Sequence, residues 1–113
     1  PDSVAFIMGL THKDISTTKG KYKDWGILGL GQLPGPSCVV STFRLGRKAR
    51  NKRHIRQRLA RVARHELGHN LGLPHCPAEA CFMRDAEGKL ATVDEEGDLL
   101  CGASRAKVKW AVK

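Results

Sequence analysis

Three histidines and a glutamate stand close together in the middle of the chain, where residues 65–75 read HELGHNLGLPH. Histidines four residues apart on a helix lie about 40° from alignment and ~6 Å apart along its axis, so His65 and His69 can face one cation. Zinc in a catalytic site takes three protein ligands and keeps one position for water. The third ligand therefore has to come from outside the helix.

Gly72 makes this possible, because a residue without Cβ lets the chain leave the helix sharply and turns His75 back towards the metal. Glu66 lies on the neighbouring strip of helix surface and can reach a metal-bound water without ligating the ion, which predicts a general base. Zinc lowers the pKa of its water towards ~7 and polarises a carbonyl. The expected chemistry is hydrolysis of peptide bonds by a zinc metallopeptidase.

Two alternatives stay open. The histidines could hold zinc in a catalytically silent domain, although such a domain has no need to keep Glu66. The arginine-rich helix could instead bind nucleic acid, which calls for aromatic stacking partners beside the positive charge. No aromatic residue falls within the basic run 44–64, so nucleic acid is the less favoured partner.

The motif must be carried by a helix, and apolar residues recur at helical spacing from about residue 52 to residue 71. Gly72 closes this helix, and Pro74 prevents it from continuing. The two faces differ in polarity: Ile55, Leu59, Val62, Ala63, Leu67 and Leu71 on one, and Arg53, Gln57, Arg61 and Arg64 on the other.

Short β-branched and apolar segments predict strands upstream of the helix. Residues 4–9 predict a buried strand with Met8 in the core, 25–36 a glycine-punctuated strand or bulge, and 38–43 a third strand in which Cys38 is buried. Residues 12–24 are polar and predict a mobile loop. The segment 84–97 predicts another loop, and residues 99–112 a C-terminal helix.

The charge is arranged in two blocks within a net charge of +9. Ten of the twenty lysines and arginines fall between residues 44 and 64 with no acid among them, and seven of the eleven acids follow between residues 79 and 98. We expect a solvated basic helix face opposite an acidic loop, with the two blocks attracting one another.

The residues after the third histidine add a second pattern to the histidine motif. Cys76 follows directly, Cys81 comes after four intervening residues, and Met83 stands two positions further on. Seventeen residues then separate Met83 from Cys101. With the histidine motif, this pattern resembles the archaemetzincin (archaelysin) family of zinc peptidases, in the metzincin clan.

The resemblance implies an α+β, metzincin-like fold, with a small mixed β-sheet packed on a long active-site helix and a short C-terminal part containing a helix. Residues 1–113 would form a single catalytic domain, with a sheet part at 1–72 and a C-terminal part at 73–113. Met83 would be the methionine of the turn beneath the zinc, against the alternative of plain core filler. The family usually carries a further strand and helix before this region, so either this is a minimal member or upstream residues are missing.

In this family a second, structural zinc is held by four cysteines, which here would be Cys76, Cys81, Cys101 and the residue at position 104. That residue is Ser104, and a serine hydroxyl is a poor zinc ligand. The second zinc is therefore possible only if Cys38, another side chain or water completes it. Thiols without metal, or a disulfide such as Cys81 with Cys101, are the alternatives.

The expected partner is a peptide or protein substrate, bound alongside an edge strand that we place at residues 38–44. No apolar run approaches the ~20 residues that cross a bilayer, so no membrane partner is expected. We expect a monomer, and the resemblance implies a cytoplasmic location.

Overall fold

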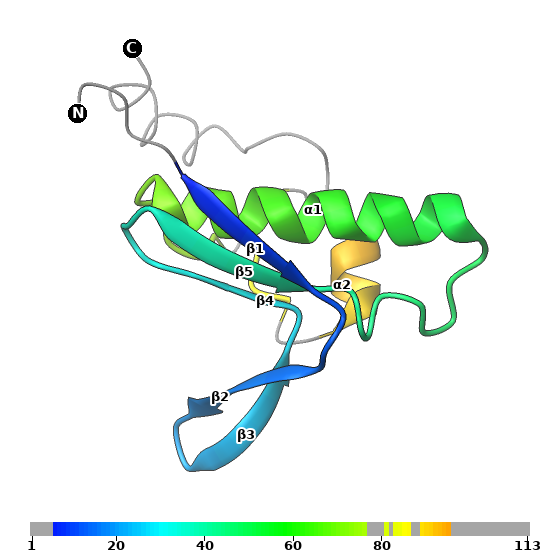
Figure 1. Ribbon diagram of the computed structural model, residues 1–113, viewed down its shortest axis with the longest axis horizontal. Helices are drawn as coiled ribbons and strands as arrows, with labels where there is room; N and C mark the ends of the chain where they lie inside the picture. Colours follow the sequence, from blue (N-terminus) through cyan, green and yellow to red (C-terminus); the bar gives the residue numbers. More distant parts are fainter. Residues whose placement is uncertain (1–5, 77–80, 82, 87–88, 96–113) are drawn as a thin grey trace.

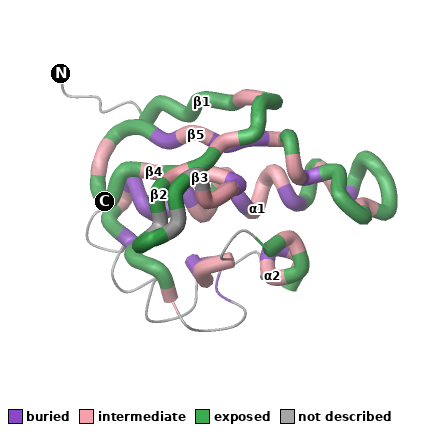
Figure 2. Tube along the Cα trace, turned by 90° about the horizontal axis from the view of Figure 1, so that it is seen from below, coloured by how far each residue is buried: buried purple, intermediate pink, exposed green. Residues whose placement is uncertain are grey.

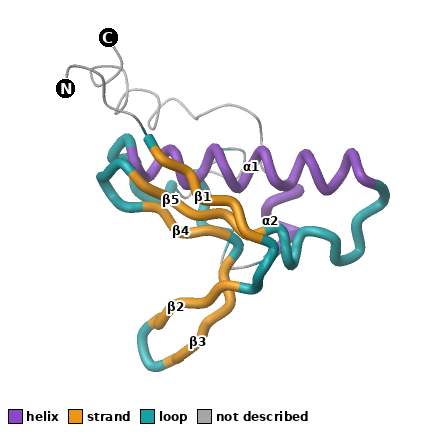
Figure 3. The backbone as a smooth tube through the Cα atoms, in the orientation of Figure 1, coloured by secondary structure: helices purple, strands orange, loops and turns teal. Residues whose placement is uncertain are grey.

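The computed structural model describes residues 6–76, 81, 83–86 and 89–95. A three-stranded mixed sheet packs against one long helix, and a two-stranded hairpin projects from the sheet (Figures 1 and 3). This is the predicted α+β architecture. The elements are β1 (Ile7–Thr11), β2 (Ile15–Lys19), β3 (Tyr22–Ile27), β4 (Gly29–Gly31), β5 (Ser37–Ser41), α1 (Lys52–Asn70) and α2 (Leu90–Glu95).

Helix α1 begins and ends within one residue of the prediction. The Asn51 side chain caps its first turn by accepting a hydrogen bond from the backbone N–H of His54 at 2.9 Å. At the other end Gly72 adopts a φ of 93°, and the N–H of Leu73 bonds back to the carbonyl of Gly68 at 2.9 Å. A left-handed glycine is a common way to end a helix, and here it redirects the chain towards His75.

The core lies between α1 and the middle of the sheet, where β5 is flanked by β1 and β4 in the order β1-β5-β4. Val40 of β5 and Leu45 are fully buried, and Val62 of α1 packs into the same cluster. Cys38 of β5 is 8% exposed, which confirms it as a buried residue. Helix α1 lies between the sheet and α2 (Figure 2), and its buried residues face both of them.

Strand β1 differs from the prediction for residues 4–9. It begins at Ile7, pairs parallel with β5, and leaves its side chains at the surface, with Met8 41% and Leu10 64% exposed. Apolar composition predicted burial, but α1 packs on β5 and β4, and β1 lies at the other edge of the sheet (Figure 2). The prediction of a buried strand with Met8 in the core was therefore wrong for the described residues; positions 4 and 5 lie outside them.

The loop predicted at residues 12–24 is instead a β-hairpin. Strands β2 and β3 pair antiparallel around Gly20, whose φ is 58°. Arg44 fastens the base of the hairpin through a bidentate hydrogen bond to Asp14, at 2.8 and 2.9 Å. Leu28 then separates β3 from β4, so the segment predicted as strand or bulge at 25–36 is strand only as far as Gly31, and it is divided between two sheets.

The loop predicted at residues 84–97 contains the short helix α2, held by charge. Asp94 bonds Arg58 at 2.9 Å and His54 at 2.9 Å, and Arg58 also donates to the carbonyls of Leu45 and Arg47. The basic and acidic blocks attract one another as predicted. Arg58 is only 3% exposed, however, so this part of the basic face is not solvated.

The C-terminal helix predicted at residues 99–112 lies outside the described residues. Among the residues that are described, no helix combines the length and the apolar character needed to traverse a membrane.

Candidate metal centre

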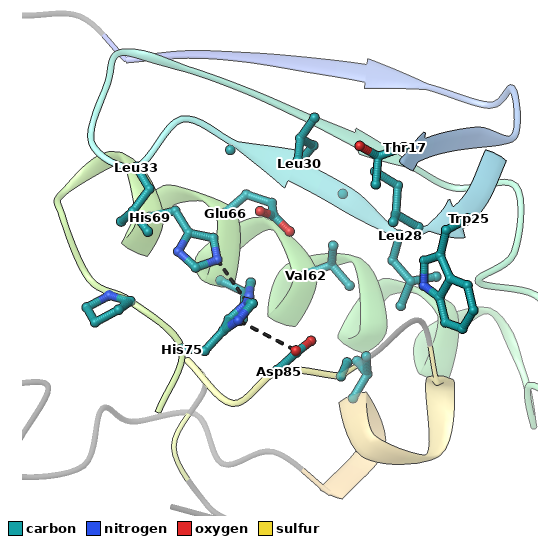
Figure 4. Close-up of a pocket in the computed structure, with 17 residues that line it drawn as sticks. Thr17, Trp25, Leu28, Leu30, Leu33, Val62, Glu66, His69, His75 and Asp85 are labelled. Carbon is teal, nitrogen blue, oxygen red and sulfur yellow. Dashed lines mark hydrogen bonds and ion pairs between the residues drawn. The ribbon is translucent and has the colours of Figure 1, made fainter. Parts of the chain in front are cut away.

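Three imidazole rings converge where α1 ends. His65 and His69 stand on α1, and His75 returns to them after the bend at Gly72. One ligand nitrogen from each ring lies within 4.8 Å of the others, and the ring centroids are 4.7 to 5.2 Å apart. His69 and His75 point towards each other in Figure 4, with 3.2 Å between their Nε2 atoms.

The donor set fits a zinc ion. Nδ1 of His69 lies 2.8 Å from the carbonyl oxygen of Leu73, so this nitrogen carries the proton and Nε2 keeps its lone pair. Burial lowers the pKa of His69, which also favours the neutral ligand form. Tetrahedral zinc with bonds of ~2.0–2.1 Å separates its nitrogen ligands by roughly 3.3–3.4 Å, close to the spacing found between His69 and His75.

Glu66 is a buried carboxylate on the same helix, 6% exposed, in the space between α1 and β4 (Figure 4). Desolvation by burial raises its pKa to about 7. Glycines of β4 make this close approach possible: a Cβ on Gly29 would lie 2.8 Å from Oε2 of Glu66, and one on Gly31 would lie 2.7 Å from its carbonyl oxygen. Alternate glycines in a strand signal such a backbone approach, and sequence reasoning did not use that signal.

Met83 lies directly beneath the histidine helix. It is fully buried, and a Cβ placed on Gly68, between the two helical histidines, would collide with its Sδ atom. The carbonyl of Met83 also accepts a hydrogen bond from the N–H of Cys76 at 2.9 Å. The turn that carries Met83 is therefore tied both to α1 and to the residue that follows His75.

A cavity of about 460 Å³ extends from the histidines to the hairpin. Its walls are mostly apolar, and sequence reasoning found only the histidines and Glu66 among the residues that line it. The others are Thr17, Trp25, Ile27, Leu28, Gly29, Leu30, Gly31, Leu33, Val62, Pro74, Asp85, Ala86 and Val93.

The substrate strand predicted at Cys38–Arg44 is wrong. Strand β5 (Ser37–Ser41) is the middle strand of the sheet, paired on both sides by β1 and β4. Within the described part of the chain the sheet edge beside the cavity is β4. Chain order does not reveal this, because β5 inserts between two strands that precede it.

Three of the four cysteines, Cys38, Cys76 and Cys81, are among the residues that the structure describes. Cys81 is 1% exposed and packs with Leu73 and Met83, with Cys76 beside them. Cys38 lies on β5, away from this cluster. Cys101 and Ser104 fall outside the described residues, so the structure does not test the second zinc site.

Comparison with known proteins decides the family. The sequence profile described as Peptidase family M54 matches residues 1–110. The chain belongs to this family. Together with the archaemetzincin relatives that follow, this match confirms the predicted resemblance to archaemetzincins.

Individual relatives agree with the profile. The archaemetzincin of Halobacterium salinarum is 36% identical over 89 residues, which is 73% of this chain and 51% of that protein. The crystal structure of archaemetzincin from Methanopyrus kandleri superimposes with a TM-score of 0.79 at 28% identity, covering 93% of this chain and 54% of that one. A solved zinc-dependent peptidase from Methanocorpusculum labreanum gives a TM-score of 0.76 at 25% identity, covering 91% and 53%.

These superpositions confirm the metzincin-like α+β fold. The chain spans about half the length of the relatives it matches.

Proposed function

We propose that the chain is a zinc-dependent peptidase in which His65, His69 and His75 hold the zinc and Glu66 is the general base. The observation that carries the proposal is the convergence of three imidazole nitrogens within 4.8 Å beside a buried carboxylate. Membership of a peptidase family and similarity to a solved zinc-dependent peptidase support the same chemistry.

A bound zinc would polarise the carbonyl of the scissile peptide bond and acidify a water molecule. Glu66 accepts the proton of the attacking water on a carboxylate oxygen and then donates it to the nitrogen of the leaving amine. The positive charge of a bound ion would favour the ionised carboxylate, the form in which Glu66 acts as a base. Its burial keeps bulk water away from the proton that it carries.

The substrate is a peptide or an extended protein segment that pairs its backbone with β4. Gly29 to Gly31 form the sheet edge beside the cavity among the described strands, which suits strand addition. The mostly apolar walls of the cavity accept an apolar side chain next to the scissile bond.

Gly72 and Met83 have supporting roles. Gly72 takes the left-handed conformation that returns His75 to the centre. Met83 fills the space under Gly68 and so sets the height of the turn relative to α1.

The test begins by measuring how much zinc is bound per chain before and after treatment with a chelator. Peptidase assays of the protein reloaded with zinc follow. Glu66→Gln should keep its zinc and lose activity by ~10² to 10⁴, the usual contribution of general acid–base catalysis. Glu95→Gln is the control, because Glu95 is an exposed carboxylate that is not among the residues lining the cavity. A Glu66→Gln protein that cleaves like wild type would contradict the assignment of the base, and a wild type that binds no zinc would overturn the proposal.

The same measurement addresses the second metal. A structural zinc at Cys76, Cys81 and Cys101 predicts two ions per chain, of which Cys81→Ser loses one and keeps activity.

The single catalytic domain at 1–113, the monomeric state and the cytoplasmic location remain predictions. The nucleic-acid alternative is not favoured, because Arg58 of the basic block is buried against Asp94.

A further inference from the structure

The three histidines are supported unequally. His65 and His69 belong to α1, and His69 is buried with its Nδ1 held by the carbonyl of Leu73 at 2.8 Å. His75 stands beyond the helix, and its side chain is 48% exposed. A surface imidazole on irregular backbone can rotate freely unless a neighbour restrains it, and rotation would remove its nitrogen from the centre.

Asp85 faces the nitrogen of His75 that points away from the other histidines. Nε2 of His75 lies 3.2 Å from Nε2 of His69, whereas Nδ1 lies 3.6 Å from Oδ2 of Asp85. Figure 4 shows the three side chains in this order, with Asp85 at the cavity wall. The ring therefore has one edge towards the metal centre and the other towards a carboxylate.

The backbone holds this pair in register. The N–H of Cys76, the residue after His75, bonds the carbonyl of Met83 at 2.9 Å, and the N–H of Arg84 bonds the carbonyl of Cys81 at 3.1 Å. Met83 in turn is buried against Gly68 of α1. Asp85 is thus placed beside His75 by a turn that is anchored to the same helix as the other two histidines.

We propose that Asp85 is a positioning residue that orients His75 for the metal. A carboxylate that accepts a hydrogen bond from Nδ1–H keeps the proton on Nδ1 and the lone pair on Nε2, and it restricts rotation of the ring, as partners of metal-bound histidines commonly do. The present 3.6 Å is an ion-pair distance rather than a hydrogen bond, and both side chains are exposed enough to close it by rotation. This inference rests on the proposed function, because it requires His75 to be a ligand.

Two variants of Asp85 separate orientation from simple attraction of a cation. Asp85→Asn removes the negative charge but keeps an oxygen that can accept a hydrogen bond from the Nδ1–H of His75, whereas Asp85→Ala removes both. Glu95→Gln is the matched control, since it removes an exposed carboxylate of the neighbouring helix that pairs with Arg84 instead. All proteins are compared as the full chain, first without metal, by circular dichroism and thermal unfolding.

The readouts are the zinc dissociation constant, from competition with a chromogenic chelator, and the visible spectrum of the cobalt-substituted protein. Asp85→Ala should weaken zinc binding by about 10- to 100-fold and alter the cobalt spectrum, which reports ligand geometry. Asp85→Asn should lie between Ala and wild type, and Glu95→Gln should match wild type. Cobalt bound by cysteine is recognised by its intense sulfur charge-transfer absorption and is left out of the comparison.

Wild-type affinity in Asp85→Ala would overturn the inference. The inference would also be overturned if Asp85→Asn and Asp85→Ala weakened zinc binding equally and left the cobalt spectrum unchanged. Attraction of the cation by the negative charge would then be the whole effect. His75→Ala keeps the two proposals apart. If wild type and His75→Ala bind zinc equally, the proposed function fails; if only His75→Ala weakens binding, the role of Asp85 fails alone. Should Asp85→Ala not fold, the Asn variant decides through its cobalt spectrum.

Discussion

His65, Glu66 and His69 are carried by a regular helix, whereas His75, Met83 and Asp85 each lie outside the helices and strands that the structure describes. The helical half is held by the sheet it packs against and by Arg58, a buried residue of α1 that bonds Asp94 of α2. Among the described residues, the contacts that place the other half include Met83 against Gly68, the Cys76–Met83 hydrogen bond and the His75–Asp85 pair. Stability and metal binding should therefore respond differently when each half is disturbed.

The largest effect on stability is expected from breaking the link between α1 and α2. Asp94→Ala leaves the guanidinium of Arg58, 3% exposed, without its carboxylate, and an uncompensated buried charge costs about 3 kcal/mol. Denaturant unfolding should show this loss, while the zinc affinity of the folded fraction stays near wild type. Glu95→Ala, which removes an exposed neighbour, should change stability little. A zinc affinity that fell as steeply as stability would mean that the two halves are not separable.

The next effect is expected where the two halves touch. Gly68→Ala places a Cβ where Sδ of the fully buried Met83 now lies, and overpacking of this kind costs about 1–3 kcal/mol. Zinc affinity should fall too, because the displaced turn carries the partners of His75. In a Met83→Ala background the collision is absent, so Gly68→Ala should become neutral or stabilising by up to ~1 kcal/mol, the helix preference of alanine over glycine. Equal costs in both backgrounds would contradict the contact.

A smaller effect is expected at the bend. Gly72 and Gly20 both have positive φ, 93° and 58°, and an added Cβ meets nothing within 4 Å at either position. Alanine at each site should therefore cost about 1 kcal/mol through backbone strain alone. Only Gly72→Ala should also weaken zinc binding, since Gly20 lies in the hairpin turn. A weakened zinc site in Gly20→Ala would show that the hairpin and the metal centre are coupled.

The helical half could be predicted from the sequence because its determinants are local. Apolar spacing, two histidines four apart and a glycine followed by proline specify helix, ligands and end within one continuous stretch. The position of His75 followed from the same glycine. Even Gly68 carried a usable signal, because a glycine in a helix interior costs ~1 kcal/mol and calls for a packing reason.

The features that the sequence did not predict depend on contacts between residues far apart in the chain. Helix α2 is six residues long, too short for periodicity, and is held by Asp94 against Arg58 thirty-six positions earlier. Strands β2 and β3 are rich in β-branched and aromatic residues, but their many polar side chains suggested a loop. The central place of β5 is a matter of topology, which chain order alone does not reveal. Asp85 is one acid among many until the turn brings it to His75.

The smallest effect tests how the helical half responds to pH. Hydrogen bonds from Arg58, with a smaller contribution from His54, lower the pKa of Asp94 below its ordinary 3.8 against the opposing effect of burial. The folded state therefore favours the carboxylate more than the unfolded state does. The stability that Asp94 contributes is complete above the unfolded pKa and is lost as pH falls through the lowered folded value.

Asp94→Asn cannot titrate at this position, so it isolates the effect. The difference in free energy of unfolding between wild type and Asp94→Asn should shrink as pH falls from the ordinary carboxyl pKa through the lowered pKa of Asp94. The metal-free proteins are compared, so that protonation of the histidine ligands does not enter through lost zinc. A difference that stayed constant down to the acid limit would mean that Asp94 is not held by Arg58 in solution, and the firm support assigned to the helical half would have to come from the sheet alone.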